Sequence, residues 1–587
     1  MNTAREKFKY LGSPHNLPLV WKLLRIYFEK SLLTLEAKLR CKTATRPPYS
    51  RRKALEDRRQ RVDVSFLIDQ DTTNSQVLAF YRSLLRQVQT SWQVIYLPAE
   101  TSSPAPEISD SRFQALPPQV CPGRGSLISA CLPFVQGEWV VCVSPGAAYS
   151  ENLVEQISAA GTTTAADILF WDERYGKGVE AFLKPAWSPE LWLSVDLLDQ
   201  AAFRTELLRS LAEGWEPGSW LAGAIRAARG IQHLEQVYST LPVPCSKKAD
   251  GPSSHAQQVS AWLRQCGKTG LQTQTQPGGE LRLNWALDPA KVSIIIPTKN
   301  HYEDLSRCLD PLFTLTDYPD YEIILMDDHS TEPAVLQYYA ELQAAHPNLR
   351  IHHNAEAFNF NRVCNQGARL ASGSLLLFLN NDMEIIEAGW LRELVQFAQL
   401  PGVGAVGARL FYPDRRIQHS GIVVGLTGHA NHLFIGESES AGAHTPFGPL
   451  EAYRDFSAVT GACVLIPRAV FDQVGGFDER YRLIFSDVAI CLRIIAAGCR
   501  VVLNPWARLV HYEGRSRSHY IPLEDMLLAG EEFLAYHQAN DPYYNPGLSR
   551  IACHPVYRRW YEMPPQERLK TIMAYAEKSL ETARQDK

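Results

Sequence analysis

Apolar residues follow two different periods along the chain. A helix with one apolar stripe is predicted for residues 17–40, where the stripe consists of Leu17, Trp21, Leu24, Phe28, Leu32, Leu35 and Leu39. From residue 61 the pattern changes: VDVSFLI (62–68) predicts a strand, LAFYRSLLRQV (78–88) a helix, and WQVIYLP (92–98) a second strand. Alternation of this kind is typical of βαβ units around a parallel sheet, so an α/β fold is expected.

The same strand pattern restarts in the second half of the chain. VSIII, YEIILMD and GSLLLFLNNDM, which begin at residues 292, 321 and 373, match VSFLI, WQVIYLP and GEWVVCVSPGA of the first half. Counted from Val64 and Val292, the second strand begins 28 and 29 residues later, and the third 73 and 81 residues later. We interpret the two halves as a diverged tandem duplication.

The repeat divides the chain into five predicted parts. They are a basic amphipathic helical segment (1–60), a first domain (61–245), a linker rich in Ser, Gln, Gly and Thr (246–287), a second domain (288–530) and a helical tail (531–587). The 587 residues are 45% hydrophobic and 21% charged, which excludes a fibrous or wholly disordered chain.

Charge is unevenly distributed between the N-terminus and the remainder. Residues 1–61 contain 16 Lys and Arg against 5 Asp and Glu, a net charge of +11, so the total of -4 leaves -15 for the rest. The basic amphipathic segment fits two structures: a helix packed on the next domain, or an interfacial membrane helix beside a polybasic run. The negative total predicts no nucleic-acid partner.

Cysteine usage and the N-terminal pattern bear on location. The 12 cysteines form no C-x-x-C pair, and Cys142 and Cys463 lie inside apolar runs, where a reduced thiol packs as a small hydrophobe. No signal-peptide layout is present, and no run approaches the roughly 20 apolar residues that span a bilayer. We therefore expect a cytoplasmic protein, with any contact to the inner membrane peripheral and on its cytoplasmic face.

Acidic and amide side chains follow the strands of the second copy. Asp327 ends one strand and Asn380-Asn381-Asp382 follows the next, whereas the first copy has Pro98 and Ser144-Pro145-Gly146. The carboxyl ends of parallel strands meet at one sheet edge, where such oxygens suit a hard divalent cation. Asp382 is therefore a predicted metal ligand; the alternative is an acidic residue that favours the start of the following helix.

The motifs of the second copy resemble the family 2 glycosyltransferases, which have the nucleotide-sugar-binding GT-A fold. The resemblance continues through FNFNRVCNQGA (358–368), GVGAVGARLFYPDRRIQHSGIVVG (402–425), SAVTGACVLI (457–466), VGGFDE (474–479) and NPWARLVHYEGRSRS (504–518). The chain is most similar to bacterial transferases of polysaccharide or rhamnan type with two such domains. This implies two tandem GT-A-like, Rossmann-related α/β domains, of which the first is degenerate.

The resemblance also implies roles for individual residues on the donor side. Pro297, Thr298 and Asn300 would form the first nucleotide-contacting loop, Asp327 would meet the base or ribose, and Phe358, Asn359 and Asn365 would line the sugar pocket. Asn380, Asn381 and Asp382 would form the D-x-D-type motif, in which Asp382 and His511 bind Mg²⁺ or Mn²⁺. Arg515 and Arg517 either add positive charge against the diphosphate or belong to a solvated basic loop.

On the acceptor side, Asp487 occupies the position of the family's general base. It lies in RLIFSDVAICLRI, whose apolar spacing predicts a helix that begins near Asp487 with Ser486 as its N-cap. Family members usually have an acidic or amide residue before this position and an acid two residues after it, where this chain has Ser486 and Ala489. By the same resemblance, His419 orders a loop near the acceptor rather than binding zinc.

These expectations lead to one favoured function and one alternative. The favoured function is a metal-dependent inverting glycosyltransferase that moves a hexose or deoxyhexose from a nucleotide-sugar donor to a growing cell-surface or lipid-linked polysaccharide. The alternative is a catalytically impaired scaffold that binds glycan or nucleotide sugar, because one copy lacks the acids and the other has Ala489.

Overall fold

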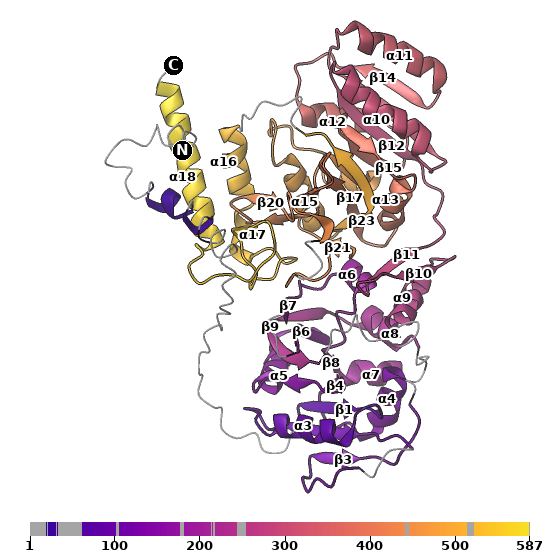
Figure 1. The fold of residues 1–587 in the computed structure, drawn as a ribbon, viewed down its shortest axis with the longest axis vertical. Helices are drawn as coiled ribbons and strands as arrows, with labels where there is room; N and C mark the ends of the chain where they lie inside the picture. The colour runs from indigo at the N-terminus through magenta and orange to yellow at the C-terminus, as the bar shows by residue number, and fades with distance from the viewer. Residues whose placement is uncertain are drawn as a thin grey trace. The chain divides into compact units, whose positions relative to one another are not determined.

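The computed structural model contains two α/β units, shown as ribbons in Figure 1. It describes residues 19, 21–26, 28–30, 32, 62–100, 105–121, 123–176, 181–212, 214, 218–242, 254–440, 445–513 and 522–585. The first unit comprises Ala44–Ala286 with Thr445–Ala452, and the second comprises Met1–Thr43, Leu287–His444 and Tyr453–Lys587. No helix in the described part of the chain combines the length and the apolar composition needed to cross a bilayer.

The first unit is a mixed sheet flanked by helices. Its elements are β1 (Val64–Ile68), α3 (Asn74–Leu84), β2 (Trp92–Tyr96), β3 (Phe113–Ala115), α4 (Arg124–Cys131), η2 (Leu132–Phe134), β4 (Trp139–Val143), β5 (Ala148–Tyr149), α5 (Leu153–Thr163), β6 (Ile168–Tyr175), β7 (Ala181–Phe182), α6 (Pro189–Ser194), β8 (Ala201–Arg204), α7 (Thr205–Leu211), α8 (Trp220–Ala227), β9 (Ile231–Leu241), α9 (Ser254–Gln265), β10 (Gln272–Thr275) and β11 (Leu281–Asn284). Strands β1, β2 and β4 are buried along their whole length, as their apolar runs predict.

The second unit repeats this arrangement and adds a helical C-terminus. Its elements are β12 (Val292–Thr298), α10 (Tyr302–Leu315), β13 (Tyr321–Asp327), α11 (Pro333–Ala345), β14 (Leu349–His353), α12 (Phe360–Leu370), β15 (Leu375–Leu379), β16 (Met383–Ile385), α13 (Trp390–Ala398), β17 (Val403–Phe411), β18 (Ile417–His419), β19 (Ile422–Val424), β20 (Ala430–His432), β21 (Arg454–Asp455), β22 (Cys463–Pro467), α14 (Arg468–Gln473), α15 (Ser486–Ala496), β23 (Arg500–His511), α16 (Leu523–Glu532), α17 (Leu534–Ala539) and α18 (Pro565–Gln585).

The strand order confirms the duplication. The first sheet runs β3-β2-β1-β4-β8-β6-β9-β5 and the second runs β14-β13-β12-β15-β22-β17-β23-β16, with β7 and β18 attached to β6 and β17. Each pairing has the same direction in both units: for example, β1 and β4 are parallel like β12 and β15, and β4 and β8 are antiparallel like β15 and β22. The predicted α/β fold class with two tandem units is therefore confirmed.

Two sequence-based expectations differ from the structure. The helix predicted at 78–88 begins at Asn74, because Thr73 and Gln76 form a reciprocal capping box that starts it earlier. The range 246–287, expected as a linker, contains α9 and the β10–β11 hairpin. This stretch is mostly polar, so the helical spacing of its buried side chains Val259 and Leu263 was not recognised in the sequence.

One side-chain contact recurs at the same place in both units. The Gly137 N–H donates to Ser65 Oγ over 2.9 Å, and the Gly373 N–H donates to Ser293 Oγ over 2.8 Å. Both glycines precede the third parallel strand, and a Cβ at Gly373 would lie 2.5 Å from the Lys291 carbonyl oxygen. Only glycine therefore lets β15 approach β12 so closely.

We predict that Gly373→Ala destabilises the second unit by about 1–3 kcal/mol, because the added methyl group forces these backbones apart. The matched control is Gly389→Ala, since a Cβ at Gly389 meets no atom within 4 Å and its φ is -81°. Urea unfolding of both variants measures the difference; equal midpoints would contradict the argument.

Candidate functional site

The first part of the site is the edge formed by the ends of β12 and β13. Thr298 and Asp327, the last residues of these strands, are paired in register. The Asn381 side-chain amide, which follows β15, donates to Thr298 Oγ1 over 3.1 Å. The structure thus brings together three residues that the sequence analysis assigned to the donor.

Asp327 is buried and held on both carboxylate oxygens. Tyr339 Oη donates to Oδ1 over 2.8 Å, while His353 Nδ1 lies 2.9 Å and the Ser330 N–H 3.3 Å from Oδ2. Burial would raise the pKa of Asp327, but the hydrogen bonds from Ser330, His353 and Tyr339 outweigh it and lower the pKa. Asp327 therefore orients the imidazole of His353, which is 69% exposed at this edge.

Asn300 connects the loops that follow β12 and β13. It adopts a left-handed backbone conformation, with φ of 50°, and its Oδ1 accepts the N–H groups of Thr331 and Glu332 over 2.8 and 3.0 Å. Its own N–H donates to Ser330 Oγ over 2.8 Å. Pro297 lies buried within β12. Asn300 thus shapes the loop through its backbone and side chain together.

The second part of the site is a pair of side chains across β16 and β23. Asp382 Oδ1 lies 3.0 Å from His511 Nε2, and the Asp382 carbonyl accepts the Tyr512 N–H over 3.0 Å. Both side chains of the pair are buried or nearly so, and Asn380 Nδ2 approaches the same imidazole nitrogen at 3.5 Å. The register that pairs Met383 with His511 holds them together.

Gln418 on β18 fixes the tautomer of His511. Its Nε2 donates to Glu513 Oε2 over 2.8 Å, and since a carboxylate only accepts, Gln418 Oε1 must face His511 Nδ1 at 2.8 Å. The Nδ1 atom therefore carries the proton. In the neutral imidazole, the Nε2 lone pair then points at Asp382 Oδ1.

This arrangement fits a divalent cation. Two facing lone pairs 3.0 Å apart require a proton or a metal ion between them, and a second-shell partner on Nδ1 is the usual support of a metal-binding histidine. Within the described residues, no group of three or more His, Cys, Asp or Glu gathers to hold a metal. Asp382 and His511 would thus supply two ligands, and water and phosphate oxygens the others, as is common for Mg²⁺.

Asp487 lies at the start of α15, on a different element from Asp382 and His511. Its Oδ2 accepts the Gly461 N–H over 3.0 Å and its Oδ1 accepts the Val488 N–H over 2.9 Å. The helix begins at Ser486, so the predicted N-cap is wrong by one residue: Phe485 occupies that position with φ of 67° and gives no side-chain cap. Two backbone donors therefore fix the carboxylate of Asp487.

The loop before α15 is organised by the C-terminal helices. Asp525 on α16 is buried and accepts the N–H groups of Arg482, Leu483 and Ile484 over 2.8 to 3.0 Å. Leu483 and Ile484 line the cavity beside Asp487. Helix α16 thus shapes the loop beside Asp487, a role that the sequence pattern did not indicate.

One cavity of about 260 Å³ joins the two acidic sides. Asp382 and His511 line it together with Asp487, and the other polar groups that reach it include Asn380, Gln418, His432, Ser486 and Glu513. The sequence analysis assigned no role to Gln418 or Glu513, although each lies within two residues of a histidine it had discussed. The cavity is therefore built from residues as far apart in the chain as Phe360 and Glu513.

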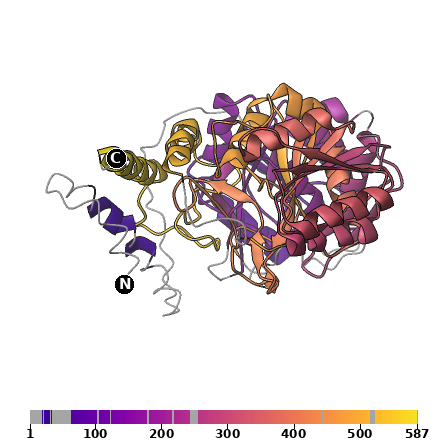
Figure 2. The ribbon, with the colours of Figure 1, turned by 90° about the horizontal axis from the view of Figure 1, so that it is seen from above.

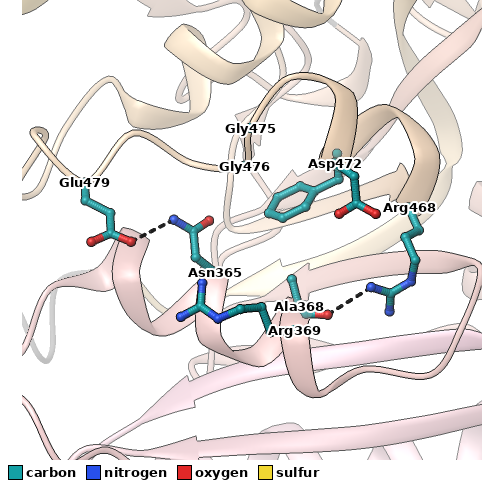
Figure 3. A pocket seen from close by; sticks show the side chains of 9 residues that line it. Asn365, Ala368, Arg369, Arg468, Asp472, Gly475, Gly476 and Glu479 are labelled. Carbon is teal, nitrogen blue, oxygen red and sulfur yellow. Dashed lines mark hydrogen bonds between the residues drawn. The ribbon is translucent and has the colours of Figure 1, made fainter.

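Asn359 and Asn365 have a different place from the one expected. Asn359 is the N-cap of α12, and its Nδ2 donates to the Glu479 carbonyl over 3.1 Å. Asn365 Nδ2 donates to the Phe477 carbonyl over 2.9 Å and to Glu479 Oε1 over 3.1 Å, as Figure 3 shows for the latter contact. Asn365 lines a separate pocket of about 400 Å³ with Arg468 and neighbouring residues. Both amides hold the loop after α14 against α12.

The remaining residues singled out from the sequence are two arginines after His511 and the histidine of β18. Arg515 and Arg517 lie outside the described residues. His419 is fully buried, and its Nδ1 lies 3.2 Å from Nδ1 of His432, which lines the cavity. Burial, with His432 and His511 nearby, lowers the pKa of His419 well below its usual value, so the ring is neutral.

Curated relatives resemble most of this chain. The O-antigen biosynthesis protein RfbC of Myxococcus xanthus is 36% identical over 414 residues, which cover 67% of this chain and 32% of the relative. The uncharacterized protein y4gI of Sinorhizobium fredii is 31% identical over 417 residues, or 65% of this chain and 45% of the relative. The chain thus spans less than half the length of either relative.

A shorter similarity and a family profile add to these relatives. The N-acetylglucosaminyl-diphospho-decaprenol L-rhamnosyltransferase of Mycobacterium tuberculosis is 41% identical over 58 residues, 10% of this chain and 19% of the relative. Residues 293–473, from β12 to the end of α14, match the family described as Glycosyl transferase family 2. The second unit thus contains a domain that matches the family 2 glycosyltransferases.

Proposed function

We propose that this chain is an inverting glycosyltransferase that takes a hexose or deoxyhexose from a nucleotide sugar. The observation that carries the proposal is that Asp382, His511 and Asp487 line one cavity. A departing diphosphate requires positive charge beside it, and an acceptor hydroxyl requires a base. Asp382 and His511 would hold a cation that supplies this charge, and Asp487 would be the base.

The donor side would bind the nucleotide diphosphate. Thr298 and Asn381 lie at the strand ends with Asp327, which orients the exposed His353. When bound, a Mg²⁺ or Mn²⁺ ion at Asp382 and His511 would neutralise the charge of the leaving diphosphate. Arg515 and Arg517 remain sequence-based candidates for additional positive charge.

The acceptor side would activate the incoming hydroxyl. Its oxygen attacks the anomeric carbon, the bond from that carbon to the diphosphate oxygen breaks, and the hydroxyl proton passes to a carboxylate oxygen of Asp487. The Gly461 and Val488 N–H groups keep this carboxylate in place. Attack from the face opposite the leaving group inverts the anomeric configuration.

The acceptor class is proposed from the relatives. Their printed names concern O-antigen biosynthesis and rhamnosyl transfer to a lipid diphosphate sugar. We therefore propose a growing cell-surface or lipid-linked polysaccharide as the acceptor, reached from the cytoplasmic side of the membrane. The alternative, a scaffold that binds sugar nucleotides without transfer, is favoured by Ser486 and Ala489, which replace expected polar side chains beside Asp487.

Only the second unit is proposed to bind the donor. In the first unit Ser144-Pro145-Gly146 follows β4, the strand that corresponds to β15. The Arg124 guanidinium donates to Ser144 Oγ over 2.9 Å and forms an ion pair with Asp199, which is buried. At this strand end the first unit thus has the guanidinium of Arg124, whose charge Asp199 already neutralises, where the second unit has Asp382.

The first prediction from this proposal concerns stoichiometry. Calorimetric titration of the full chain with a panel of nucleoside diphosphates and Mn²⁺ should give one binding site per chain. Arg124→Ala should leave that single site unchanged, because Ser144-Pro145-Gly146 still follows β4 in place of Asn380-Asn381-Asp382. Two metal-dependent sites per chain would contradict the assignment of the first unit.

The second prediction concerns the metal side. Asp382→Ala should reduce sugar transfer roughly 10³-fold, since neutralisation of the leaving group is worth several kcal/mol. Thermal unfolding should be nearly unchanged, because the residue lies at the sheet edge. Asp414→Ala, which alters an exposed loop carboxylate paired with Arg416, is the control and should transfer normally.

Transfer by Asp382→Ala at the wild-type rate with Mg²⁺ or Mn²⁺ would contradict the metal assignment. A wild-type chain that binds nucleotide but neither transfers nor hydrolyses any donor of a broad panel would favour the scaffold instead.

The third prediction concerns the base. Asp487→Asn keeps the shape of the side chain but cannot take the proton, so transfer should fall roughly 10²–10⁴-fold. Nucleotide affinity should stay nearly unchanged, because Asp487 is proposed to meet the acceptor and not the diphosphate. Asp472→Asn on α14 is the control. Loss of binding and transfer together in Asp487→Asn, or normal transfer, would remove Asp487 from the mechanism.

A further inference from the structure

The N-terminal amphipathic segment, defined here as the described residues between 19 and 32, exposes its apolar stripe. All of these residues are helical. Trp21, Phe28 and Leu32, which share the predicted stripe, are 66%, 57% and 45% exposed. A helix that packs on a domain normally buries this stripe and exposes its charged residues.

A charged residue of the segment is buried instead. Glu29 is only 3% exposed, and its carboxylate accepts the Met563 N–H over 2.9 Å and pairs with the Arg568 guanidinium at the start of α18. Arg25 Nε lies 3.1 Å from the same carboxylate, and Lys22 pairs with Glu567 at 3.4 Å. Figure 2 shows this segment, in indigo, beside α18.

These ion pairs fix which face of the segment points outward. Separating the buried Glu29 from Arg568 would leave an uncompensated charge, which typically costs several kcal/mol. The segment therefore cannot turn its aromatic side chains inward without losing this contact. The face that contains the buried Leu19 and Glu29 docks on the C-terminal residues, and Trp21 and Leu32 remain accessible.

A second exposed aromatic residue adjoins the docked face. Trp560 is 84% exposed, and it precedes Tyr561, whose carbonyl accepts a hydrogen bond from Arg25 Nη2 over 3.3 Å. Two tryptophans thus lie accessible near one contact between the chain's two ends. Tryptophan favours the boundary between water and lipid headgroups, because its ring is apolar and its N–H is polar.

Basic side chains lie beside the exposed aromatic ones. Lys22 and Arg25 are about half exposed although each contacts an acid, and the sequence of residues 1–61 has a net charge of +11. Basic groups beside exposed aromatic side chains match a layer of anionic lipid headgroups. A neutral or basic partner surface would satisfy the aromatic groups but leave this excess of positive charge without a counterpart.

We propose that the surface formed by Trp21, Phe28, Leu32 and Trp560 binds a bilayer that contains anionic lipids. The aromatic and aliphatic side chains enter the headgroup layer, and the neighbouring basic residues pair with lipid phosphates. This inference concerns attachment to the membrane and holds whether or not the second unit transfers sugar.

The test is flotation of the full chain with two kinds of vesicle. One contains phosphatidylglycerol in phosphatidylcholine, and the other contains phosphatidylcholine alone. The wild-type chain should float with the first and not with the second, and added salt should weaken its binding. The double variant Trp21→Ser/Leu32→Ser should bind the anionic vesicles roughly ten- to hundredfold more weakly, since two apolar side chains no longer enter the bilayer.

The matched control is Leu315→Ser/Leu336→Ser, which removes two leucines that are 42% and 46% exposed on α10 and α11. It should bind vesicles like the wild type. Absence of wild-type binding to anionic vesicles, or equal binding by both double variants, would overturn the proposal. So would a wild-type dimer that Trp21→Ser/Leu32→Ser abolishes in the absence of vesicle binding, because the surface would then pair two copies. Donor hydrolysis, measured in parallel, reports separately on the proposed function.

Discussion

A carboxylate and an imidazole held 3.0 Å apart by paired strands form the constraint on which the chemistry of the second unit depends. The antiparallel register of β16 and β23 sets the separation of Asp382 and His511, and the Gln418–Glu513 contact sets the tautomer. The sheet core thus determines where a cation can bind and which lone pair it meets. Asp487 depends on a different support, since its position follows from α15 and from the loop that Asp525 holds. Because the Asp382–His511 pair and the Asp487 carboxylate line one cavity, two groups of different chemistry would face the same substrate.

The two units show how much of this arrangement belongs to the scaffold and how much to the strand ends. Both sheets have the same order and directions, and both use a glycine against a serine to bring two strands together. The difference lies in the residues after β4 and β15. In the first unit Arg124 and Asp199 neutralise each other at that edge, so its polar groups stabilise the fold instead of remaining available to a ligand. The same scaffold is thus stable with different residues at its strand ends.

The sequence predicted the α/β class and the duplication, because buried parallel strands give apolar runs whose spacing survives divergence. Strand β13 matches its predicted range of 321–327, and Asp382, His511 and Asp487 do line one cavity. Helix α9 was missed, since three or four buried positions in a polar stretch carry little signal. Asn359 and Asn365 were assigned to a sugar pocket by motif alone, but their amides bind backbone carbonyls of the loop after α14. A motif identifies a conserved type of position and does not say whether a polar side chain faces a ligand or the backbone.

The N-terminal segment shows a related limit of pattern reasoning. Helical periodicity identifies the side chains that share a face, but it does not determine which face meets the protein. Burial of the apolar stripe is the usual outcome because it removes the largest area from water. Here the buried Glu29 carboxylate, paired with Arg568 and hydrogen-bonded to the Met563 N–H, determines the orientation instead. A buried ion pair of this kind tolerates little rotation, whereas an apolar stripe is stabilised by any environment that excludes water. A lipid surface that covers these exposed apolar side chains, in place of the rest of the chain, would therefore explain why the stripe faces outward.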